Sequence, residues 1–194
     1  MTRSEDRREI RDVRALAALA HPVRSALLSH LMAVGPRTAS ECAPAVGASA
    51  SNCSWHLRHL ARFGLVERDE GVGGDGRERP WRAAATGFHF GGEAAADDPA
   101  TRAAQHALLS VQLDEEARLA RAHLRGVDEL PTAWQEASAF NRYGLLLTPA
   151  ELSELEERLD ALIRPYIGMT RDDAPAEARH VHLGLRAFRF PEQS

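Results

Sequence analysis

The stretch from Thr38 to Leu65, TASECAPAVGASASNCSWHLRHLARFGL, has the pattern of two short helices joined by a glycine turn. Thr38 and Glu41 match the S/T-x-x-E capping box, in which two backbone donors at a helix start are satisfied reciprocally. This first helix is expected to end near Val46, because Gly47 favours the left-handed backbone conformation that stops a helix. The stretch therefore predicts a helix-turn-helix.

The second helix of this stretch begins after Ser49, which can cap it, and Gly64 follows its end. Its buried face is predicted from apolar residues at helical spacing: Cys53, Leu57, Leu60 and Ala61. Its solvent face carries small, hydrogen-bonding and cationic residues: Ala50, Ser51, Asn52, Ser54, Trp55, Arg58 and Arg62. Small residues let a helix enter the major groove of DNA, while Ser, Asn and Arg bind base edges or phosphates. An ordinary solvated helix face is the alternative interpretation of this segment.

A β-hairpin with a glycine-rich tip is predicted after this helix. Leu65 to Arg68 has the pattern of a short strand, residues 70–78 contain four glycines, and residues 79–82 resume an extended segment. A glycine-rich stretch can also bind phosphate, but no Lys-Ser/Thr pair follows this one and it joins two strands. Such a hairpin is the wing of a winged-helix domain. Arg77 and Arg79 in this wing are placed to contact the DNA backbone or minor groove.

Three short sequence motifs, taken together, point to a known family. They are His21-Pro22-x-Arg24, then Ser54-x-His56-Leu57-x-x-Leu60-x-x-x-Gly64-Leu65-Val66, then Gly76-Arg77-Glu78-Arg79-Pro80-Trp81. Together they resemble the ArsR-type winged-helix transcriptional regulators, in the branch with a C-terminal extension. The resemblance implies that the first 85 residues bind double-stranded DNA, that the chain is a homodimer, and that it acts as a repressor.

Many ArsR-type proteins sense metals, and the resemblance allows this chain to be compared with them. The thiolate-type sensors carry Cys-x-Cys in the helix before the recognition helix, where this chain has Thr38 and Ser40. Its two cysteines, Cys42 and Cys53, fall on apolar helix faces, where a free thiol behaves as a small hydrophobe. We therefore predict no metal site, no other cofactor, and no metal response through cysteine.

Composition and charge describe an ordinary globular protein with one mildly basic half. The chain has 194 residues, of which 44% are hydrophobic and 27% charged, and its formal net charge is −4. Residues 1–84 hold 13 Arg against 10 acidic residues, net +3, whereas residues 85–194 hold 11 Arg against 18, net −7. A basic module on an acidic body is compatible with DNA binding, because binding depends on the local field. With no apolar segment of membrane-spanning length and no signal-peptide pattern, we expect a cytoplasmic protein that does not interact with membranes.

The segments that flank the helix-turn-helix complete the predicted domains. Ser4 to Ala20 has the pattern of an amphipathic helix, and Pro22 can end it or open the next helix, which reaches Gly35. Residues 86–99 are expected to be a linker because they are rich in Gly, Ala and Asp. From Pro99 or Thr101 a long helix should run to about Arg125, and in the family such flanking helices form the dimer interface.

The last third of the chain is predicted to be a small α/β unit. Ser138 to Leu147 and His180 to Phe190 have strand patterns, and between them lies a helix that Thr148 can cap, with Pro149 in its first turn. The aromatic residues concentrated here either form a core or line a pocket for a small-molecule effector, whose identity the sequence does not give.

The sequence thus predicts a mostly α fold with small β content. An N-terminal winged helix-turn-helix domain (residues 1–85) is followed, after the linker, by a C-terminal α+β dimerisation or sensing region (residues 100–194). The predicted function is a dimeric, sequence-specific DNA-binding transcriptional regulator. The alternative is a winged-helix protein-interaction module attached to a ligand-binding or enzymatic C-terminal unit, although no nucleophile elbow, metal pair or P-loop favours an enzyme.

Overall fold

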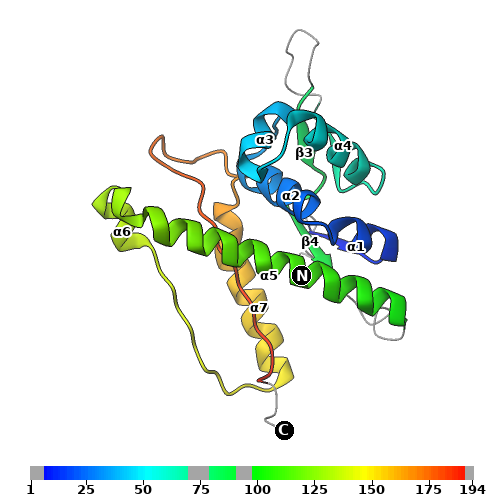
Figure 1. The fold of residues 1–194 in the computed structure, drawn as a ribbon. Coiled ribbons are helices and arrows are strands. Elements are labelled where there is room, and N and C mark those ends of the chain that lie inside the picture. The colour runs from blue at the N-terminus through cyan, green and yellow to red at the C-terminus, as the bar shows by residue number, and fades with distance from the viewer. Residues whose placement is uncertain (1–6, 70–78, 91–97, 191–194) are drawn as a thin grey trace.

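The structure, a computed structural model, describes residues 7–69, 79–90 and 98–190 of the chain (Figure 1). Its elements in order are β1 (Arg7–Ile10), α1 (Val13–Leu19), α2 (Pro22–Val34), α3 (Ala39–Val46), α4 (Ala50–Ala61), β2 (Val66–Arg68), β3 (Trp81–Ala83), β4 (Gly87–Phe90), α5 (Pro99–Gly126), η2 (Val127–Glu129), α6 (Thr132–Ala137), α7 (Pro149–Ile163) and η3 (Arg164–Tyr166). The predicted mostly α fold with small β content is confirmed. Among the described residues, no helix combines the length and the apolarity that a membrane crossing requires.

The predicted helix-turn-helix is formed by α3 and α4, and its capping interactions are present. Thr38 Oγ1 accepts a hydrogen bond from the Glu41 amide at 3.2 Å, and the Glu41 carboxylate accepts one from the Thr38 amide at 2.7 Å. Gly47 has φ 64°, the left-handed conformation expected at the end of α3. Ser49 Oγ then accepts from the Asn52 amide at 3.2 Å and so opens α4.

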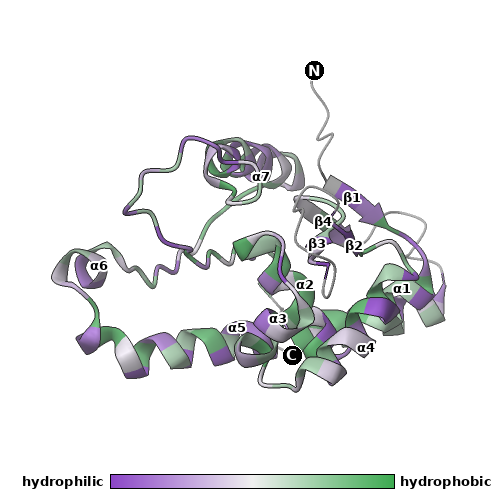
Figure 2. Ribbon diagram, turned by 90° about the horizontal axis from the view of Figure 1, so that it is seen from above, coloured by the Kyte–Doolittle hydropathy of each residue, from purple (hydrophilic) through white to green (hydrophobic). Residues whose placement is uncertain are grey.

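One hydrophobic core joins α1, α2, α3, α4 and the first half of α5. Its fully buried leucines are Leu16, Leu19, Leu27, Leu31, Leu57, Leu60, Leu65 and Leu108. Leu108 lies on α5, so this helix belongs to the same core as the helix-turn-helix and is not merely attached to it. Complete burial of each such side chain stabilises the fold by about 1.5–3 kcal/mol relative to exposure. Figure 2 shows α6 and α7 lying apart from the cluster of α1 to α4.

The predicted hairpin is confirmed at both of its strands. β2 and β3 pair antiparallel, with Val66 opposite Ala83 and Arg68 opposite Trp81. Trp81 also exchanges two backbone hydrogen bonds with Arg37, at 2.7 and 2.9 Å, just before α3 begins. The hairpin is thereby fixed to the start of the helix-turn-helix. The glycine-rich tip lies outside the described residues.

Two predictions at the two ends of the N-terminal domain are wrong. The helix expected from Ser4 begins only at Val13, because the Asp12 side chain accepts a hydrogen bond from the Arg14 amide and caps it there. The residues before this cap form β1, which pairs in parallel with β4, from Arg7↔Gly87 to Ile10↔Phe90. β4 lies inside the predicted linker, so part of that segment is a strand bonded to the N-terminal domain.

In the C-terminal half the predicted helices are present and the predicted strands are absent. α5 runs from Pro99 to Gly126 with Asp98 as its cap, and α7 begins with a capping box formed by Thr148 and Glu151. Residues 138–147 and 180–190 are extended but are not strands, because no described segment pairs with them. The strands predicted from alternating apolar residues are therefore wrong in this chain.

Removing the α3 cap should destabilise the N-terminal core. Thr38→Ala is expected to lower the free energy of unfolding by about 1 kcal/mol, because the Glu41 amide loses its acceptor. Thr38→Ser should stay close to the wild type. Urea unfolding followed by tryptophan fluorescence measures both variants.

Thr148→Ala is the matched control for this test. It removes the same capping box from α7, which buries no side chain, so the unfolding midpoint of the N-terminal core should barely change. Equal losses for Thr38→Ala and Thr148→Ala would contradict the conclusion that α3 belongs to the core and α7 does not.

Candidate nucleic-acid interface

The exposed face of α4 carries most of the residues that the sequence predicted for DNA contact. The opposite face is buried through Cys53, Leu57 and Leu60. Ser49, Ser51, Asn52, Trp55, Arg58 and Arg62 are exposed, and Arg79 is exposed beside β3. Ala50 and Ser54 are only half-buried rather than freely solvated, because their positions border the buried stripe of the helix. Arg77 lies outside the described residues.

The N-terminal half of α4 presents hydrogen-bonding groups without competing negative charge. Ser49 and Ser51 place their hydroxyl oxygens 3.1 Å apart, and the Asn52 side chain next along the helix is exposed. No acidic residue occurs between Glu41 and Glu67. The unpaired backbone amides and positive dipole of a helix N-terminus add to a surface of this kind, which suits an anion such as a phosphate.

Trp55 is the large aromatic residue of this face, with 54% of its surface exposed. Its ring stacks on His59, with centroids 5.7 Å apart and an interplanar angle of 23°. Its edge-to-face contact with His56, at 4.8 Å, joins it to the buried side of the helix. Two aromatic contacts therefore hold Trp55 in place while its free face remains available to a partner.

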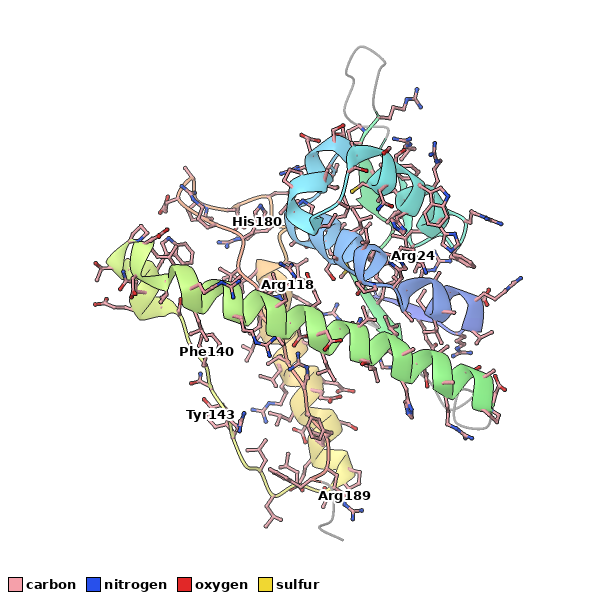
Figure 3. All side chains as sticks on the ribbon, viewed as in Figure 1. Arg24, Arg118, Phe140, Tyr143, His180 and Arg189 are labelled. Carbon is pink, nitrogen blue, oxygen red and sulfur yellow. The ribbon has the colours of Figure 1, made fainter. Side chains whose placement is uncertain are left out.

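Behind α4, His56 packs against His21, the residue that precedes α2. The two rings are 4.7 Å apart, and His56 is 4% exposed. Arg24 of α2, labelled in Figure 3, lies between α1 and α4 and donates to the Ala18 carbonyl. Burial, followed by the nearby His21, Arg24 and His59, lowers the pKa of His56 to about 4. Burial and the Arg24 charge also lower the pKa of His21. Both imidazoles are therefore held neutral near pH 7.

This histidine contact was not part of the core that the sequence predicted. The apolar pattern of α4 left His56 out, because a histidine does not count as apolar in such a pattern. The available signal was the joint occurrence of His21-Pro22-x-Arg24 and Ser54-x-His56 among the residues that carry the family resemblance. The structure explains why they occur together, since they are neighbours across the α2–α4 contact.

The wing is held rigidly where it leaves the domain. The Arg68 guanidinium lies 3.8 Å from the centroid of the Trp81 ring and also donates to the Arg79 carbonyl. Opposite each other on the two strands, Glu67 and Arg82 form an ion pair at 2.6 Å. These contacts fix the base of the hairpin, at which the exposed Arg79 lies.

The thiols have the burial expected of structural cysteines. Cys42 and Cys53 are both free and fully buried. Burial raises the pKa of Cys42 to about 11 and also raises that of Cys53, whereas a metal needs the thiolate. Over the described ranges, no three His, Cys, Asp or Glu side chains are grouped as metal ligands.

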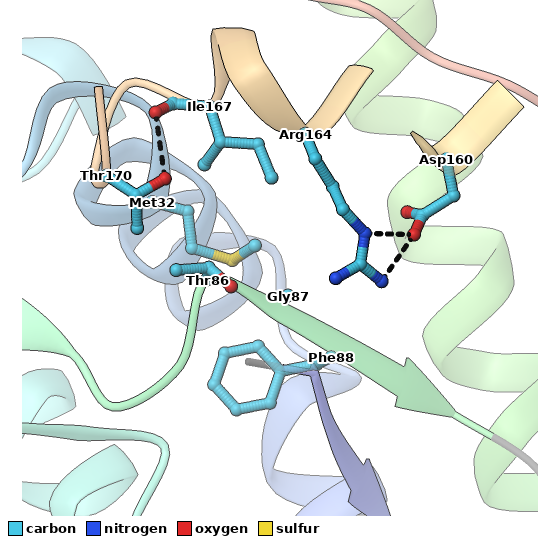
Figure 4. A pocket seen from close by; sticks show the side chains of 8 residues that line it. All are labelled: Met32, Thr86, Gly87, Phe88, Asp160, Arg164, Ile167 and Thr170. Atoms are coloured by element: carbon cyan, nitrogen blue, oxygen red, sulfur yellow. Dashed lines mark hydrogen bonds and ion pairs between the residues drawn. The ribbon is translucent and has the colours of Figure 1, made fainter. Parts of the chain in front are cut away.

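A small cavity lies where the N-terminal domain meets the chain around α7 (Figure 4). Its volume is about 280 Å³, and it is lined by Met32, Thr86, Gly87, Phe88, Asp160, Arg164, Ile167 and Thr170. Arg164 donates to Asp160 at 2.7 and 2.8 Å at one side of it. The aromatic residues predicted for a C-terminal ligand pocket do not line this cavity.

Comparison with known proteins identifies the class of the N-terminal domain. A family profile described as a helix-turn-helix domain matches residues 19–69, which extend from the end of α1 through β2. No curated protein matches the chain at a significant level. The fold and this match together show that the chain carries a helix-turn-helix domain, a type of domain that occurs in DNA-binding regulators. The match is to the helix-turn-helix class and does not single out the ArsR branch.

The buried His56 predicts a specific pH dependence of stability. Its pKa is about 4 in the folded protein against 6.5 for an unperturbed histidine, so only the unfolded chain binds this proton between these values. The stability that neutral His56 contributes is present above pH 6.5 and is lost as the pH falls toward 4. The loss should be on the order of 3 kcal/mol.

Urea unfolding of wild type and His56→Gln at several pH values between 4 and 8 measures this contribution. The variant should be less stable at pH 7 and should show a flatter profile below pH 6.5. His106→Gln, which removes an exposed histidine of α5, controls for the loss of an unconstrained imidazole. A wild-type profile as flat as that of His56→Gln would mean that His56 is not buried as a neutral group.

Proposed function

We propose that this protein is a sequence-specific DNA-binding transcriptional regulator in which α4 enters the major groove. The observation that carries the proposal is the division of α4 into a fully buried apolar face and an exposed face of hydroxyl, amide and guanidinium groups. The match of residues 19–69 to a helix-turn-helix domain supports it. Recognition helices of this class contact base edges with residues near their N-termini.

Roles for individual side chains follow from their chemistry. Asn52 can bind an adenine edge in bidentate fashion, and Arg58 can bind guanine in the same way. Ser49, Ser51 and the first amides of α4 are suited to phosphate. Trp55 offers an apolar face to a thymine methyl group or a sugar. Arg62, at the end of the helix, is placed for a neighbouring phosphate.

We assign the wing to the DNA backbone or the minor groove next to the groove that α4 occupies. Arg79 is exposed where β3 begins, and the sequence places Arg77 in the tip of the same hairpin. The Arg82 guanidinium is already paired with Glu67. Arg79, which lies two residues before β3, is therefore better placed than Arg82 to neutralise a phosphate.

The regulator is proposed to act as a homodimer and as a repressor. Two-fold symmetric dimers of helix-turn-helix proteins bind two half-sites about one helical turn apart. Past Leu108, α5 leaves Leu109, Leu113 and Leu124 about half exposed or more, which is compatible with an apolar contact between subunits. Repression is what the resemblance to ArsR-type regulators implies.

An effector is proposed to be a small molecule rather than a metal. A thiolate site is disfavoured because both cysteines are buried with raised pKa values. The cavity of about 280 Å³ contacts α2 and the chain around α7 at once. Occupancy there would change how the C-terminal half lies against the domain that carries α4.

The groove assignment is tested by removing two exposed side chains of α4. Asn52→Ala with Arg58→Ala should abolish preference for the operator, because each bidentate base contact contributes about 1–3 kcal/mol of discrimination. Stability should be unchanged, since neither side chain is buried. Once genome-wide binding-site mapping has supplied the operator, titrations of operator and scrambled DNA at fixed salt measure the effect.

The matched control is Gln105→Ala with Arg121→Ala, which removes one amide and one guanidinium from α5. This pair should leave the preference for the operator intact. Full operator affinity in the Asn52/Arg58 variant would show that α4 does not read the bases.

The wing assignment is tested through the salt dependence of binding. Arg79→Ala should weaken specific and non-specific binding alike and reduce the slope of log affinity against log salt by about 0.9, the value for one phosphate. Arg82→Ala should change this slope less, because Glu67 already neutralises that guanidinium. If titration of the wild type with DNA shows no salt-dependent binding, the alternative of a protein-interaction module is favoured.

A further inference from the structure

The C-terminal half of the chain leaves its large apolar side chains exposed, whereas the N-terminal domain buries them. From Leu109 to Phe190 the structure contains no buried residue. The large apolar side chains that are exposed in residues 138–190 are Phe140, Tyr143, Leu145, Leu146, Leu147, Leu162, Tyr166, Val181, Leu183, Leu185, Phe188 and Phe190. We call residues 138–147, α7 and residues 180–190 together the open unit.

Two extended segments of the open unit lack strand partners. Residues 139–147 and 180–188 form no backbone hydrogen bond with any other described segment. In Figure 3, Tyr143 lies on a stretch of chain that runs apart from both α5 and α7. An extended, apolar backbone with free amides and carbonyls is a template for pairing with another strand.

The sequence of both segments is suited to such pairing. Val181, Leu183, Leu185 and Ala187 alternate with other residues, and so do Tyr143, Leu145 and Leu147, so each segment would present one apolar face as a strand. No proline occurs between Pro131 and Pro149, or between Pro175 and Pro191. The missing amide of proline therefore interrupts neither segment.

The exposed area is too large for a compact single chain. The chain exposes 14268 Å², whereas a folded monomer of 21.3 kDa exposes about 9,100 Å². Obligate homodimers bury about 2,000–5,000 Å² in total, or about 1,000–2,500 Å² on each subunit. The excess of one chain is therefore larger than the area that such an interface covers on each subunit.

We propose that a second copy of this chain covers the open unit, and that the extended segments of the two copies pair as strands of one intermolecular sheet. A second copy fits because it brings identical unpaired, apolar segments, so each copy satisfies the other across a two-fold axis. The area that must be covered is that of an obligate dimer. This inference specifies the surface for the homodimer of the proposed function and rests on that dimer, but not on DNA binding.

Contacts within the chain hold the open unit in position for such pairing. Arg186 forms an ion pair with Glu116 of α5, and a side chain at Gly184 would meet the same carboxylate at 3.0 Å. Phe140 contacts His123 near the end of α5, with ring centroids 5.9 Å apart. Both segments are therefore attached to α5, which itself belongs to the N-terminal core through Leu108.

Sedimentation equilibrium of the full chain without DNA tests the proposal. The wild type should be a dimer at micromolar concentration. Leu183→Glu with Leu185→Glu should raise the dimer dissociation constant by about 100-fold or more, because charges would enter the buried centre of an interface. Both leucines are more than half exposed in the single chain, so the monomer should keep its circular dichroism. Trp55→Glu, at a similarly exposed site of α4, should not change the dimer.

A second pair of variants separates this inference from the proposed function. If Leu109→Glu with Leu113→Glu on α5 gives monomers while the Leu183/Leu185 variant remains dimeric, the dimer exists but the open unit is not its interface. A monomeric wild type would overturn both statements. DNA binding by α4 to a single half-site is measured separately and does not depend on either result.

Hydrogen–deuterium exchange gives a readout specific to strand pairing. In the wild-type dimer the amides of residues 139–147 and 180–188 should be protected, and the Leu183/Leu185 variant should lose this protection. The amides of α4 should be equally protected in both proteins. Exchange of the two segments at the rate of an unstructured chain in a wild-type dimer would overturn the proposal.

Discussion

The burial of one face of α4 is the constraint on which the rest of the arrangement depends. Successive residues of a helix are about 100° apart, so fixing Cys53, Leu57 and Leu60 in the core fixes the direction of every other side chain of α4. A rotation by one residue would turn Asn52 toward the core and expose an apolar side chain. The chemistry of the exposed face is thus set by packing on the opposite face, which the His21–His56 contact reinforces.

The same core determines how the wing and α5 lie relative to α4. Trp81 is buried at the base of the hairpin and shares two backbone hydrogen bonds with Arg37, directly before α3. Leu108 places the first half of α5 in contact with the other leucines. The hairpin base, α4 and the start of α5 therefore form one packed body, whereas residues 109–190 contain no buried side chain.

Local chemistry made the N-terminal domain predictable, and the need for distant partners limited prediction elsewhere. The Thr38–Glu41 box, Gly47 and the apolar spacing of α4 act over four residues or fewer, and they predicted α3, α4 and which face of α4 is buried. β1 and β4 were missed because each becomes a strand only by pairing with the other, some 80 residues away. For residues 180–190 the error was the opposite one: a strand was predicted where none is found. Alternating apolar residues favour an extended chain, but they do not supply the second strand with which it must pair. His56 was missed because a neutral, buried histidine depends on its neighbours and not on its own polarity.

The parallel pairing of β1 with β4 has a consequence for the geometry of an operator. β4 leads toward α5, and β1 is tied to the end of α4 because Arg8 donates to the Gly64 carbonyl at 2.6 Å. Leu108 also holds α5 in the core that buries one face of α4, so α4 and the start of α5 belong to one packed body. In the proposed dimer, the two copies of α4 therefore keep a fixed separation along the DNA and a fixed rotation about its axis. Such a protein would tolerate a change of half-site spacing by a whole turn of about 10 base pairs. A change by half a turn would put the second half-site on the opposite side of the DNA and should be tolerated far less. Helical phasing would then be part of its sequence specificity.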